Sequence, residues 1–338
     1  MNPTQDRYAR FGLVRDMLRT PDIVAGYRLP DVGDVAKRIA AAGKVLLTGE
    51  GSSRIFPAKH VIMQARRAGW PLVMHTEAAR QAQEYALTGW AVFAASNSGR
   101  TSEVIKLFQE LRAKGHGDLF GLTATPGSKL GEVAHANFVL GCGKEDAVAA
   151  TKSVVEQALF YHALFERVAG GNALAAGLAA TGAACREALT IAIDPTLVAK
   201  GAKAGTIYFA GRNDGIAEEL ALKTNEITRK KSDFLEGTYA AHGVEEVMDR
   251  NDVVIWIDPY DDAQTKFMDV LVKGVGLTVI AISSRETPFP TVRIPESPFP
   301  GYVQMCAGWS VLVEIGLQLG IDLDKPQRAR KVGNEFVG

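Results

Sequence analysis

Short runs of consecutive apolar residues alternate along the chain with longer segments in which apolar residues recur at helical spacing. In chain order the runs, some with their loops, occupy residues 44–48, 71–74, 91–95, 119–123, 137–140, 206–213, 252–257, 277–283 and 291–294. Continuous runs of this kind are typical of strands that are buried on both faces of a parallel sheet. Strands that alternate with helices imply a sheet covered by helices on both sides. The pattern therefore predicts an α/β fold.

The order of strands and loops in the first half of the chain is repeated in the second half. The segments 206–213 and 252–257 are spaced like 45–54 and 91–95, and the two later runs of each half also correspond. Such a repeat indicates two units of the same design. We expect two doubly wound parallel-sheet domains with flanking helices.

The repeat also sets the expected domain boundaries. We expect a helical segment over 1–43, a first domain over 44–175, a second domain over 176–325 and a C-terminal tail over 326–338. Within the first segment, Thr20-Pro21 predicts a break or a new helix start, because proline favours the first turn of a helix.

The composition and charge of the chain bear on the kinds of partner that the protein can have. The chain is 47% hydrophobic and 22% charged, as in soluble globular proteins. Lys plus Arg and Asp plus Glu number 38 each, so we expect neither nucleic acid nor a membrane as partner. Cys142, Cys185 and Cys306 lack a metal-binding spacing, which favours a reducing cytoplasm and no metal. Charged residues replace the apolar core of a signal peptide at the N-terminus, and polar residues interrupt the apolar stretch 302–320, which is predicted as a buried helix.

The first candidate chemistry follows the run 91–95. The segment reads Ser96-Asn97-Ser98-Gly99-Arg100-Thr101, and apolar residues at helical spacing begin at Val104. Hydroxyl side chains, a glycine and the free N–H groups of a helix start form a site suited to an anion. We interpret the loop as the phosphate site for a sugar phosphate. A turn that is merely capped by serine and threonine is the alternative.

The loop after the first run is Gly49-Glu50-Gly51-Ser52-Ser53-Arg54. It lacks the third glycine of a dinucleotide-binding fingerprint, and the sequence has no P-loop motif. Ser52 and Ser53 suit a smaller anion or sugar hydroxyls. Ligands bind such loops at the carboxyl ends of the strands in open α/β sheets.

The loops and the repeat together resemble the SIS (sugar isomerase) family of phosphosugar proteins. The pair of domains is similar to the isomerase half of glucosamine-6-phosphate synthase and to stand-alone glucosamine-6-phosphate deaminases. The resemblance extends from about residue 44 to the C-terminus and implies a sugar phosphate as substrate, with no cofactor. It also implies one site that uses residues of both domains.

In the first domain the resemblance implies contacts with the phosphate and the sugar. Asn97 stands where the family more often has glutamine, and the backbone contacts lie in the segment 143–152. The implied contact residues are Ser52, Ser53, Ser96, Asn97, Ser98, Thr101 and, through backbone groups, Val148 and Ala149.

In the second domain a predicted helix carries Glu219, Lys223 and Glu226. Spacings of four and three place these side chains on one helical face. From composition alone, such a face is more often a solvated set of ion pairs. The resemblance instead assigns Glu226 as the base that moves a proton between C1 and C2, Lys223 as the residue that orients or tunes the carboxylates, and Glu219 to the substrate site.

Two more residues take a role only from the resemblance. His242 would open the sugar ring, although Val244 stands where the family has proline and the usual acidic residue three positions before the histidine is missing. Lys331 would reach back into the sugar site and form a Schiff base with an open-chain ketose, with Arg330 beside it where a small residue is usual. A basic tail is otherwise typical of a solvated chain end.

These features predict an isomerase that acts on an amino sugar phosphate, favouring deamination of glucosamine 6-phosphate to fructose 6-phosphate and ammonia. We expect no glutamine-dependent synthesis by this chain alone, since no glutaminase segment precedes the first domain. A deglycase of a phosphorylated fructosyl-amino acid and a non-catalytic sugar-phosphate regulator are the alternatives. The resemblance also implies a homodimer with a shared active site, in which the neighbouring subunit can lend His242.

Overall fold

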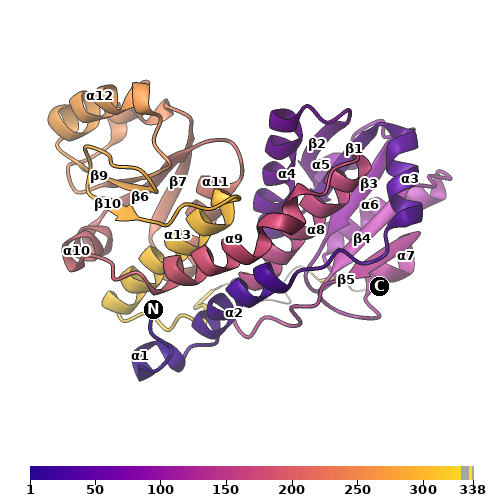
Figure 1. The fold of residues 1–338 in the computed structure, drawn as a ribbon, viewed down its shortest axis with the longest axis horizontal. Helices are drawn as coiled ribbons and strands as arrows, with labels where there is room; N and C mark the ends of the chain where they lie inside the picture. Colours follow the sequence, from indigo (N-terminus) through magenta and orange to yellow (C-terminus); the bar gives the residue numbers. More distant parts are fainter. Residues whose placement is uncertain (329–334, 337–338) are drawn as a thin grey trace. The chain divides into compact units, whose positions relative to one another are not determined.

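Among the described residues, ten strands form two sheets of five parallel strands, one in each half of the chain (Figure 1). The structure is a computed structural model that describes residues 1–328, 335 and 336. Contacts divide the chain into two units. The N-terminal unit comprises residues 26–145, 150–178 and the described residues from 328 on, and the C-terminal unit comprises residues 1–25, 146–149 and 179–327.

The two sheets have the same strand order. The order is β2-β1-β3-β4-β5 in the N-terminal unit, and β7-β6-β8-β9-β10 in the C-terminal unit when the sheet is followed from the β7 edge. All neighbouring strands are parallel. The predicted pair of doubly wound α/β folds is confirmed. The bounds of the strands are β1 (Lys44–Gly49), β2 (Val73–Ala78), β3 (Ala91–Ala95), β4 (Leu119–Thr123), β5 (Ala136–Val139), β6 (Thr206–Gly211), β7 (Lys231–Glu236), β8 (Val253–Ile257), β9 (Thr278–Ser283) and β10 (Thr291–Arg293).

Helices connect the strands and cover the sheets. The α-helices are α1 (Asp6–Ala9), α2 (Gly12–Gly26), α3 (Gly33–Ala42), α4 (Ile55–Ala68), α5 (Ala79–Ala82), α6 (Ser102–Ala113), α7 (Lys129–Val133), α8 (Lys152–Val168), α9 (Ala173–Thr190), α10 (Pro195–Lys203), α11 (Ile216–Thr228), α12 (Gln264–Phe267) and α13 (Pro300–Gln318). Shorter 3₁₀ turns are η1 (Gly51–Ser53), η2 (Tyr239–Ala241), η3 (Val244–Val247) and η4 (Asp261–Ala263), and η5 (Met268–Val275) is a stretch of π-helix.

Each sheet packs its own apolar core against helices. In the N-terminal unit, Val92 and Ala94 of β3 pack with Val104 and Phe108 of α6, all of them fully buried. In the C-terminal unit, the ring of Trp256 on β8 stacks on that of Phe267, with ring centroids 3.6 Å apart. This packing holds β3 and β8 in place and so sets where the loops that follow these two strands begin.

One local expectation is wrong, and one strand was not predicted. Helix α2 continues through Pro21 from Gly12 to Gly26, so Thr20-Pro21 does not break it. Strand β7 has no counterpart among the predicted runs. Its sequence Lys-Ser-Asp-Phe-Leu-Glu is mostly polar, because β7 lies at the edge of its sheet and only Leu235 is fully buried.

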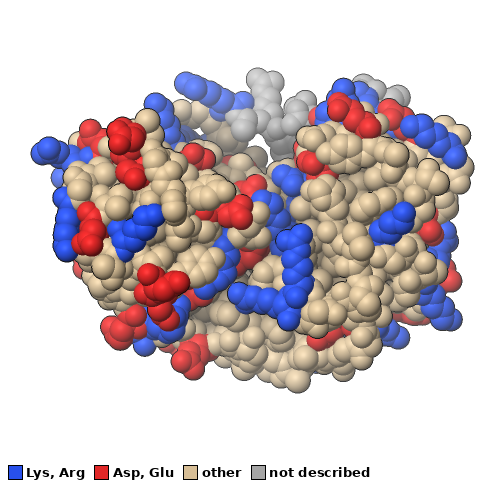
Figure 2. All heavy atoms as spheres, turned by 90° about the horizontal axis from the view of Figure 1, so that it is seen from above, with Lys and Arg blue, Asp and Glu red and all other residues tan. Residues whose placement is uncertain are grey.

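Charges of both signs are interspersed among uncharged residues over the face seen in Figure 2. This agrees with the equal numbers of acidic and basic residues. No helix among the described residues is long and apolar enough to span a membrane.

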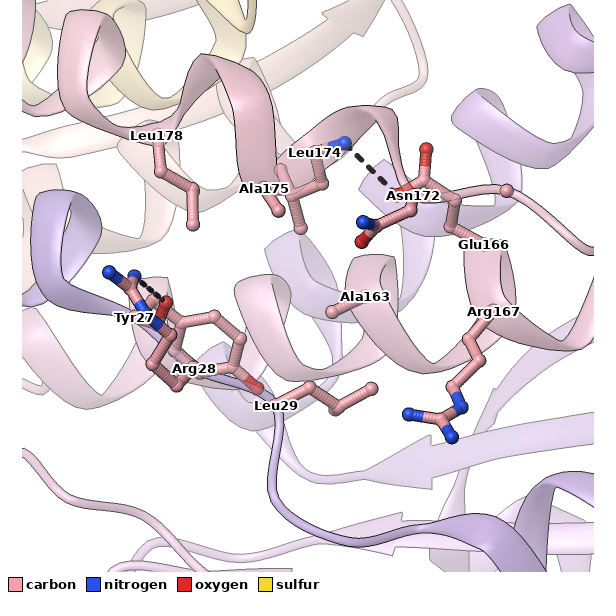
Figure 3. A pocket seen from close by; sticks show the side chains of 11 residues that line it. Tyr27, Arg28, Leu29, Ala163, Glu166, Arg167, Asn172, Leu174, Ala175 and Leu178 are labelled. Carbon is pink, nitrogen blue, oxygen red and sulfur yellow. Dashed lines mark hydrogen bonds between the residues drawn. The ribbon is translucent and has the colours of Figure 1, made fainter.

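The junction between α8 and α9 is fixed by a carboxylate. Glu166 accepts hydrogen bonds from the backbone N–H groups of Ala173 (2.8 Å) and Leu174 (3.0 Å), which begin α9. The hydrogen bond from Leu174 is drawn in Figure 3. Because the first N–H groups of a helix lack partners within the helix, this carboxylate stabilises the start of α9.

Candidate active site

The two serine-containing loops leave neighbouring strands of the N-terminal sheet. Strands β1 and β3 are paired, with Thr48 opposite Ala94, so the loops that follow them start side by side. The chain connects β1 to β2 on one side and β3 to β4 on the other, so the strand order reverses here. Open α/β sheets bind ligands at this kind of switch point.

The loop after β3 is a tight turn closed by hydroxyl groups. Ser96 is buried, and its Oγ lies 2.8 Å from Oγ1 of Thr101. The N–H of Gly99 donates to the carbonyl of Ser96 at 3.0 Å. Gly99 has φ +63°, and a Cβ there would lie 2.3 Å from Cβ of Ser128. The turn therefore requires glycine at this position.

Helix α6 begins directly after this turn. Thr101 precedes its first residue but makes no side-chain cap, because its hydroxyl is engaged with Ser96. Ser98 Oγ accepts the N–H of Arg100 at 3.2 Å. The first N–H groups of a helix and its dipole favour an anion. The loop thus combines hydroxyl groups with the N-terminus of a helix that is twelve residues long. Such an arrangement is able to hold a phosphate.

The loop after β1 contributes Ser52 and Ser53 within η1. Ser53 Oγ accepts a hydrogen bond from Nε2 of Gln157 on α8 at 3.4 Å. Both serines are half-buried. The structure thus brings Ser52, Ser53, Ser96, Asn97, Ser98 and Thr101 to the carboxyl ends of two adjacent strands.

Glu145 organises the segment that leads into α8. It is buried, and its Oε1 accepts the N–H groups of Thr151 and Ser153, each at 2.9 Å. Lys152 is buried as well, and its Nζ donates to the carbonyl of Lys144 at 2.8 Å. Glu145 was not predicted to have a separate role, because it precedes the first turn of α8 in the sequence and reaches that turn only through the fold.

Val148 and Ala149 lie in the short stretch of this segment that groups with the C-terminal unit. There the N–H of Asp146 donates to Oδ2 of Asp16 on α2 at 2.6 Å. Asp16 is fully buried. Asp324, which follows α13, accepts the N–H groups of Gly12 and Leu13 at 2.8 Å each.

Helix α11 carries a buried ammonium between two carboxylates. Nζ of Lys223 lies 2.6 Å from Oε2 of Glu226 and 3.4 Å from Oε1 of Glu219. The side chains of Lys223 and Glu219 are 1% and 0% exposed, whereas that of Glu226 is 35% exposed. The expectation of a solvated ion-pair face is therefore wrong, because α11 turns this face inward.

The electrostatics of the triad follow from this burial. Burial lowers the pKa of Lys223, but the charges of Glu226 and Glu219 and their hydrogen bonds raise it by more, so the net pKa lies above its ordinary value. Lys223 is thus held as an ammonium. Glu226 presents a carboxylate that is fixed on one side by a cation and open to solvent on the other.

His242 follows η2 in an exposed position. Its backbone N–H donates to the carbonyl of Tyr239 at 3.0 Å, and its Nε2 lies 3.1 Å from Nζ of Lys266 on α12. Because an ammonium can only donate, Nε2 of His242 is the acceptor in this contact. Within the described part of the chain, His242 makes no hydrogen bond with Glu226.

The predicted Schiff-base residue Lys331 lies outside the described residues. Two residues beyond it are described, and they contact the loop after β3. Glu335 forms an antiparallel bridge with Thr101, and its Oε2 lies 3.2 Å from Nε of Arg100. The N–H of Phe336 donates to the carbonyl of Arg100 at 2.8 Å.

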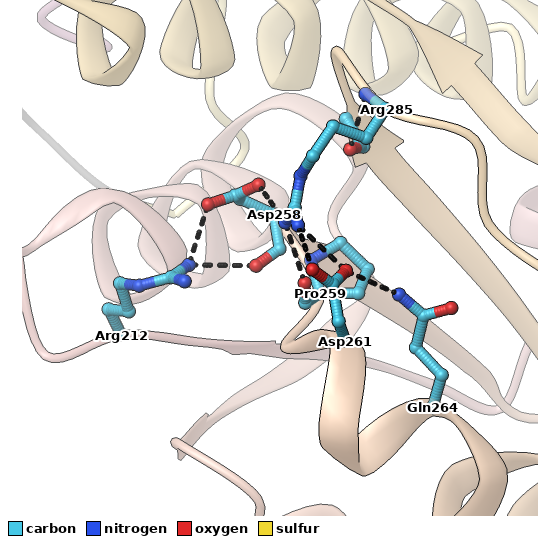
Figure 4. A network of polar contacts seen from close by, with 7 residues as sticks. Arg212, Asp258, Pro259, Asp261, Gln264 and Arg285 are labelled. Atoms are coloured by element: carbon cyan, nitrogen blue, oxygen red, sulfur yellow. Dashed lines mark hydrogen bonds and ion pairs between the residues drawn. The ribbon is translucent and has the colours of Figure 1, made fainter.

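The switch point of the C-terminal sheet differs from that of the N-terminal sheet. The loop after β8 carries Asp258, whose Oδ2 lies 2.8 Å from Arg212 and whose Oδ1 lies 2.8 Å from Arg285 (Figure 4). Arg285 also contacts Asp261 at 2.6 Å, and Arg212 lies over the ring of Tyr260. The sequence analysis missed this network, which the acidic residues after the apolar run of β8 could have signalled. Among the described residues, no cluster of His, Cys, Asp and Glu is suited to a metal ion.

Comparison with known proteins places this geometry in context. Residues 39–167 match the SIS domain family. Over 321 residues the chain is 25% identical to glutamine–fructose-6-phosphate aminotransferase (isomerizing) of Aeropyrum pernix, covering 87% of this chain and 51% of that protein. The chain therefore spans about half the length of this curated relative.

Solved structures share the fold. The C-terminal domain of glucosamine-fructose-6-phosphate aminotransferase from Francisella tularensis has a TM-score of 0.76 and 17% identity, covering 96% of this chain and 100% of that one. Glucosamine-6-phosphate deaminase from Thermotoga maritima has a TM-score of 0.73 and 17% identity, covering 95% and 98%. Tagatose-6-phosphate ketose/aldose isomerase from Escherichia coli has a TM-score of 0.77 and 15% identity, covering 95% and 97%. Residues 39–167 are thus similar to the SIS domain, and the chain shares the fold of these solved structures.

Proposed function

We propose that the protein is a phosphosugar isomerase that deaminates glucosamine 6-phosphate to fructose 6-phosphate. One water is consumed, and ammonia is released. The observation that carries the proposal is the carboxylate of Glu226, open to solvent and 2.6 Å from the buried ammonium of Lys223. The names of the similar proteins, an aminotransferase that isomerises fructose 6-phosphate and a glucosamine-6-phosphate deaminase, agree with this chemistry.

The first half of the proposed chemistry is phosphate binding. The hydroxyl groups of Ser96, Ser98 and Thr101 and the N-terminus of α6 supply donors and a favourable dipole. Ser52 and Ser53 supply donors for the sugar hydroxyls from the neighbouring loop. Binding at the phosphate, remote from the reacting carbons, fixes the orientation of the substrate.

The second half is proton transfer. Glu226 takes the proton from C2 of the open-chain sugar and returns it to C1, which passes through an enolamine. Lys223 keeps Glu226 in place, since the ammonium and the carboxylate attract each other in a partly buried setting. His242 opens the ring, a step for which an imidazole is suited because it can accept a proton at one nitrogen and donate one from the other. Water then hydrolyses the resulting C2 imine to the ketone and ammonia. Lys331 forms a Schiff base with this ketone, which expels one water that is taken up again when the Schiff base is hydrolysed.

The test measures ammonia and fructose 6-phosphate after incubation with glucosamine 6-phosphate. We expect Glu226→Gln to lower kcat by about 10²- to 10⁴-fold, because the amide cannot accept the proton. Glu218→Gln, on the same helix, is the matched control and keeps its activity. In D₂O, the wild type places deuterium on C1 of the product and Glu226→Gln does not. Wild-type protein that releases no ammonia would exclude this reaction, and equal activity of the two variants would exclude Glu226 as the base.

A further inference from the structure

A cavity lies in the N-terminal unit, where α8 ends and α9 begins. It has a volume of about 420 Å³ and is lined by the linker from Tyr27 to Leu29, the end of α8 and the first turns of α9. None of its lining residues belongs to the loops after β1 and β3. A cavity of this size is in the range of small-molecule sites. It has no part in the function proposed above.

The floor of the cavity is apolar and its ends are cationic. Leu29, Leu174 and Leu178 supply the apolar surface. Figure 3 shows the side chains of Arg28 and Arg167 on opposite sides of this surface, with their guanidinium groups well apart. An occupant that meets both arginines must therefore extend across the leucines.

The charges that line the cavity are not balanced. Glu166 is the single carboxylate among the lining residues, and both of its oxygens accept N–H groups of α9. Arg28 donates only to the carbonyl of Tyr27, at 2.7 Å. Within the described part of the chain, neither Arg28 nor Arg167 forms an ion pair. The cavity thus presents two guanidinium groups, which pair well with planar anions.

A buried hydroxyl adds a separate indication of a ligand. Tyr27 is only 7% exposed, and its hydroxyl has no hydrogen-bond partner among the described residues. Figure 3 shows the hydroxyl end of its ring directed toward Leu29, one of the lining residues. Buried polar groups are almost always hydrogen-bonded, so an exception calls for a partner.

We propose that this cavity binds an elongated organic dianion with an apolar middle. The apolar middle lies on the three leucines, the two acid groups pair with Arg28 and Arg167, and the hydroxyl of Tyr27 donates to an oxygen of the ligand. Such a ligand would be an effector, distinct from the sugar phosphate.

The test compares three probes of the same size class by calorimetric titration. These are 1,4-phenylenediacetate with two carboxylates, phenylacetate with one and 1,4-benzenedimethanol with none. We expect the diacid to bind at least tenfold more tightly than the monoacid and the diol to bind most weakly. Equal affinities for the three probes, or for the diacid and the monoacid, would overturn the proposal.

Variants locate the binding. Arg28→Gln and Arg167→Gln should each weaken diacid binding at least tenfold, and Ala175→Trp should abolish it by filling the cavity, with melting curves to verify that each variant folds. Arg19→Gln, an exposed arginine of α2, is the control and should bind as the wild type does. Diacid binding that survives Ala175→Trp contradicts the proposal. A change in sedimentation of the arginine variants without ligand also contradicts it, because the cavity would then be an interface between copies.

A variant of the phosphate loop separates this proposal from the function. Ser98→Ala should leave diacid binding unchanged, whatever its effect on glucosamine 6-phosphate. If the protein binds the diacid but shows no deaminase activity, only the proposed function is contradicted. If it shows deaminase activity but does not bind the diacid, only the cavity proposal is contradicted.

Discussion

At the residue scale, the loop after β3 depends on one glycine for two separate reasons. Gly99 has φ +63°, a conformation that costs other residues about 1 kcal/mol or more. A Cβ at this position would also collide with Ser128, at 2.3 Å from its Cβ. Gly127 has the same φ of +63°, but a Cβ there would meet nothing within 4 Å. A comparison of alanine substitutions at Gly99 and Gly127 therefore separates the free-energy cost of the backbone conformation from the cost of the collision with Ser128.

We expect Gly99→Ala to weaken binding of inorganic phosphate at least tenfold, because the turn must open to accommodate the methyl group. Gly127→Ala should lower the free energy of unfolding by a similar backbone contribution, because its φ is the same as that of Gly99, but it should keep its phosphate affinity. Calorimetric titration with phosphate, together with urea unfolding of both variants, makes the comparison. Equal phosphate affinities of the two variants would show that the turn does not form the phosphate site.

At the element scale, α4 and α8 meet through two buried histidines. The rings of His60 on α4 and His162 on α8 have centroids 6.1 Å apart. Burial, then the charge of His162 and that of Arg67, lowers the pKa of His60 to about 3. Burial lowers the pKa of His162 to about 4. Both histidines are therefore neutral in the folded protein at neutral pH.

This pair predicts a loss of stability in acid. In the unfolded chain each histidine titrates near its ordinary pKa of 6.5, so below that pH the unfolded state binds more protons. The free energy of unfolding should fall between pH 6.5 and 4, with each histidine contributing about 1.4 kcal/mol per pH unit. His162→Gln should remove one of the two contributions and flatten the slope, while His75→Gln, which changes an exposed histidine, should not. Urea unfolding at a series of pH values measures the slope, and an unchanged slope for His162→Gln would contradict the assignment.

Patterns of apolar residues predicted some strands and helix faces of this fold but not others. Strands β3 and β4 match the apolar runs 91–95 and 119–123 residue for residue, because strands buried on both faces need continuous apolar residues. The edge strand β7 was not predicted, since it pairs with β6 alone and each of its two faces mixes one apolar residue with polar or charged residues. The spacing of Glu219, Lys223 and Glu226 predicted a shared face but not its burial. The burial of this face depends on the elements that pack against α11, such as α13, which are distant from it in the sequence.

At the scale of the whole molecule, two sheets of the same strand order carry different switch points. The loop after β3 presents hydroxyl groups, whereas the loop after β8 presents Asp258 and Asp261, both already paired with arginines. Carboxylates repel a phosphate, and ion pairs that neutralise the arginines leave them little charge to offer. The repeated fold thus supports anion binding in the N-terminal unit and a closed polar network in the C-terminal unit.

This division predicts where phosphate protects the backbone. In hydrogen–deuterium exchange with and without saturating inorganic phosphate, we expect slower exchange over residues 96–105, where the ligand orders the turn and the first turn of α6. Exchange over residues 258–263 should not change, because Asp258 and Arg285 already satisfy one another at 2.8 Å. Arg285→Gln serves as the control, since it should speed exchange over 258–263 and leave phosphate affinity as in the wild type. Protection over 258–263, or a loss of phosphate affinity in Arg285→Gln, would place an anion site in the C-terminal unit and contradict the division.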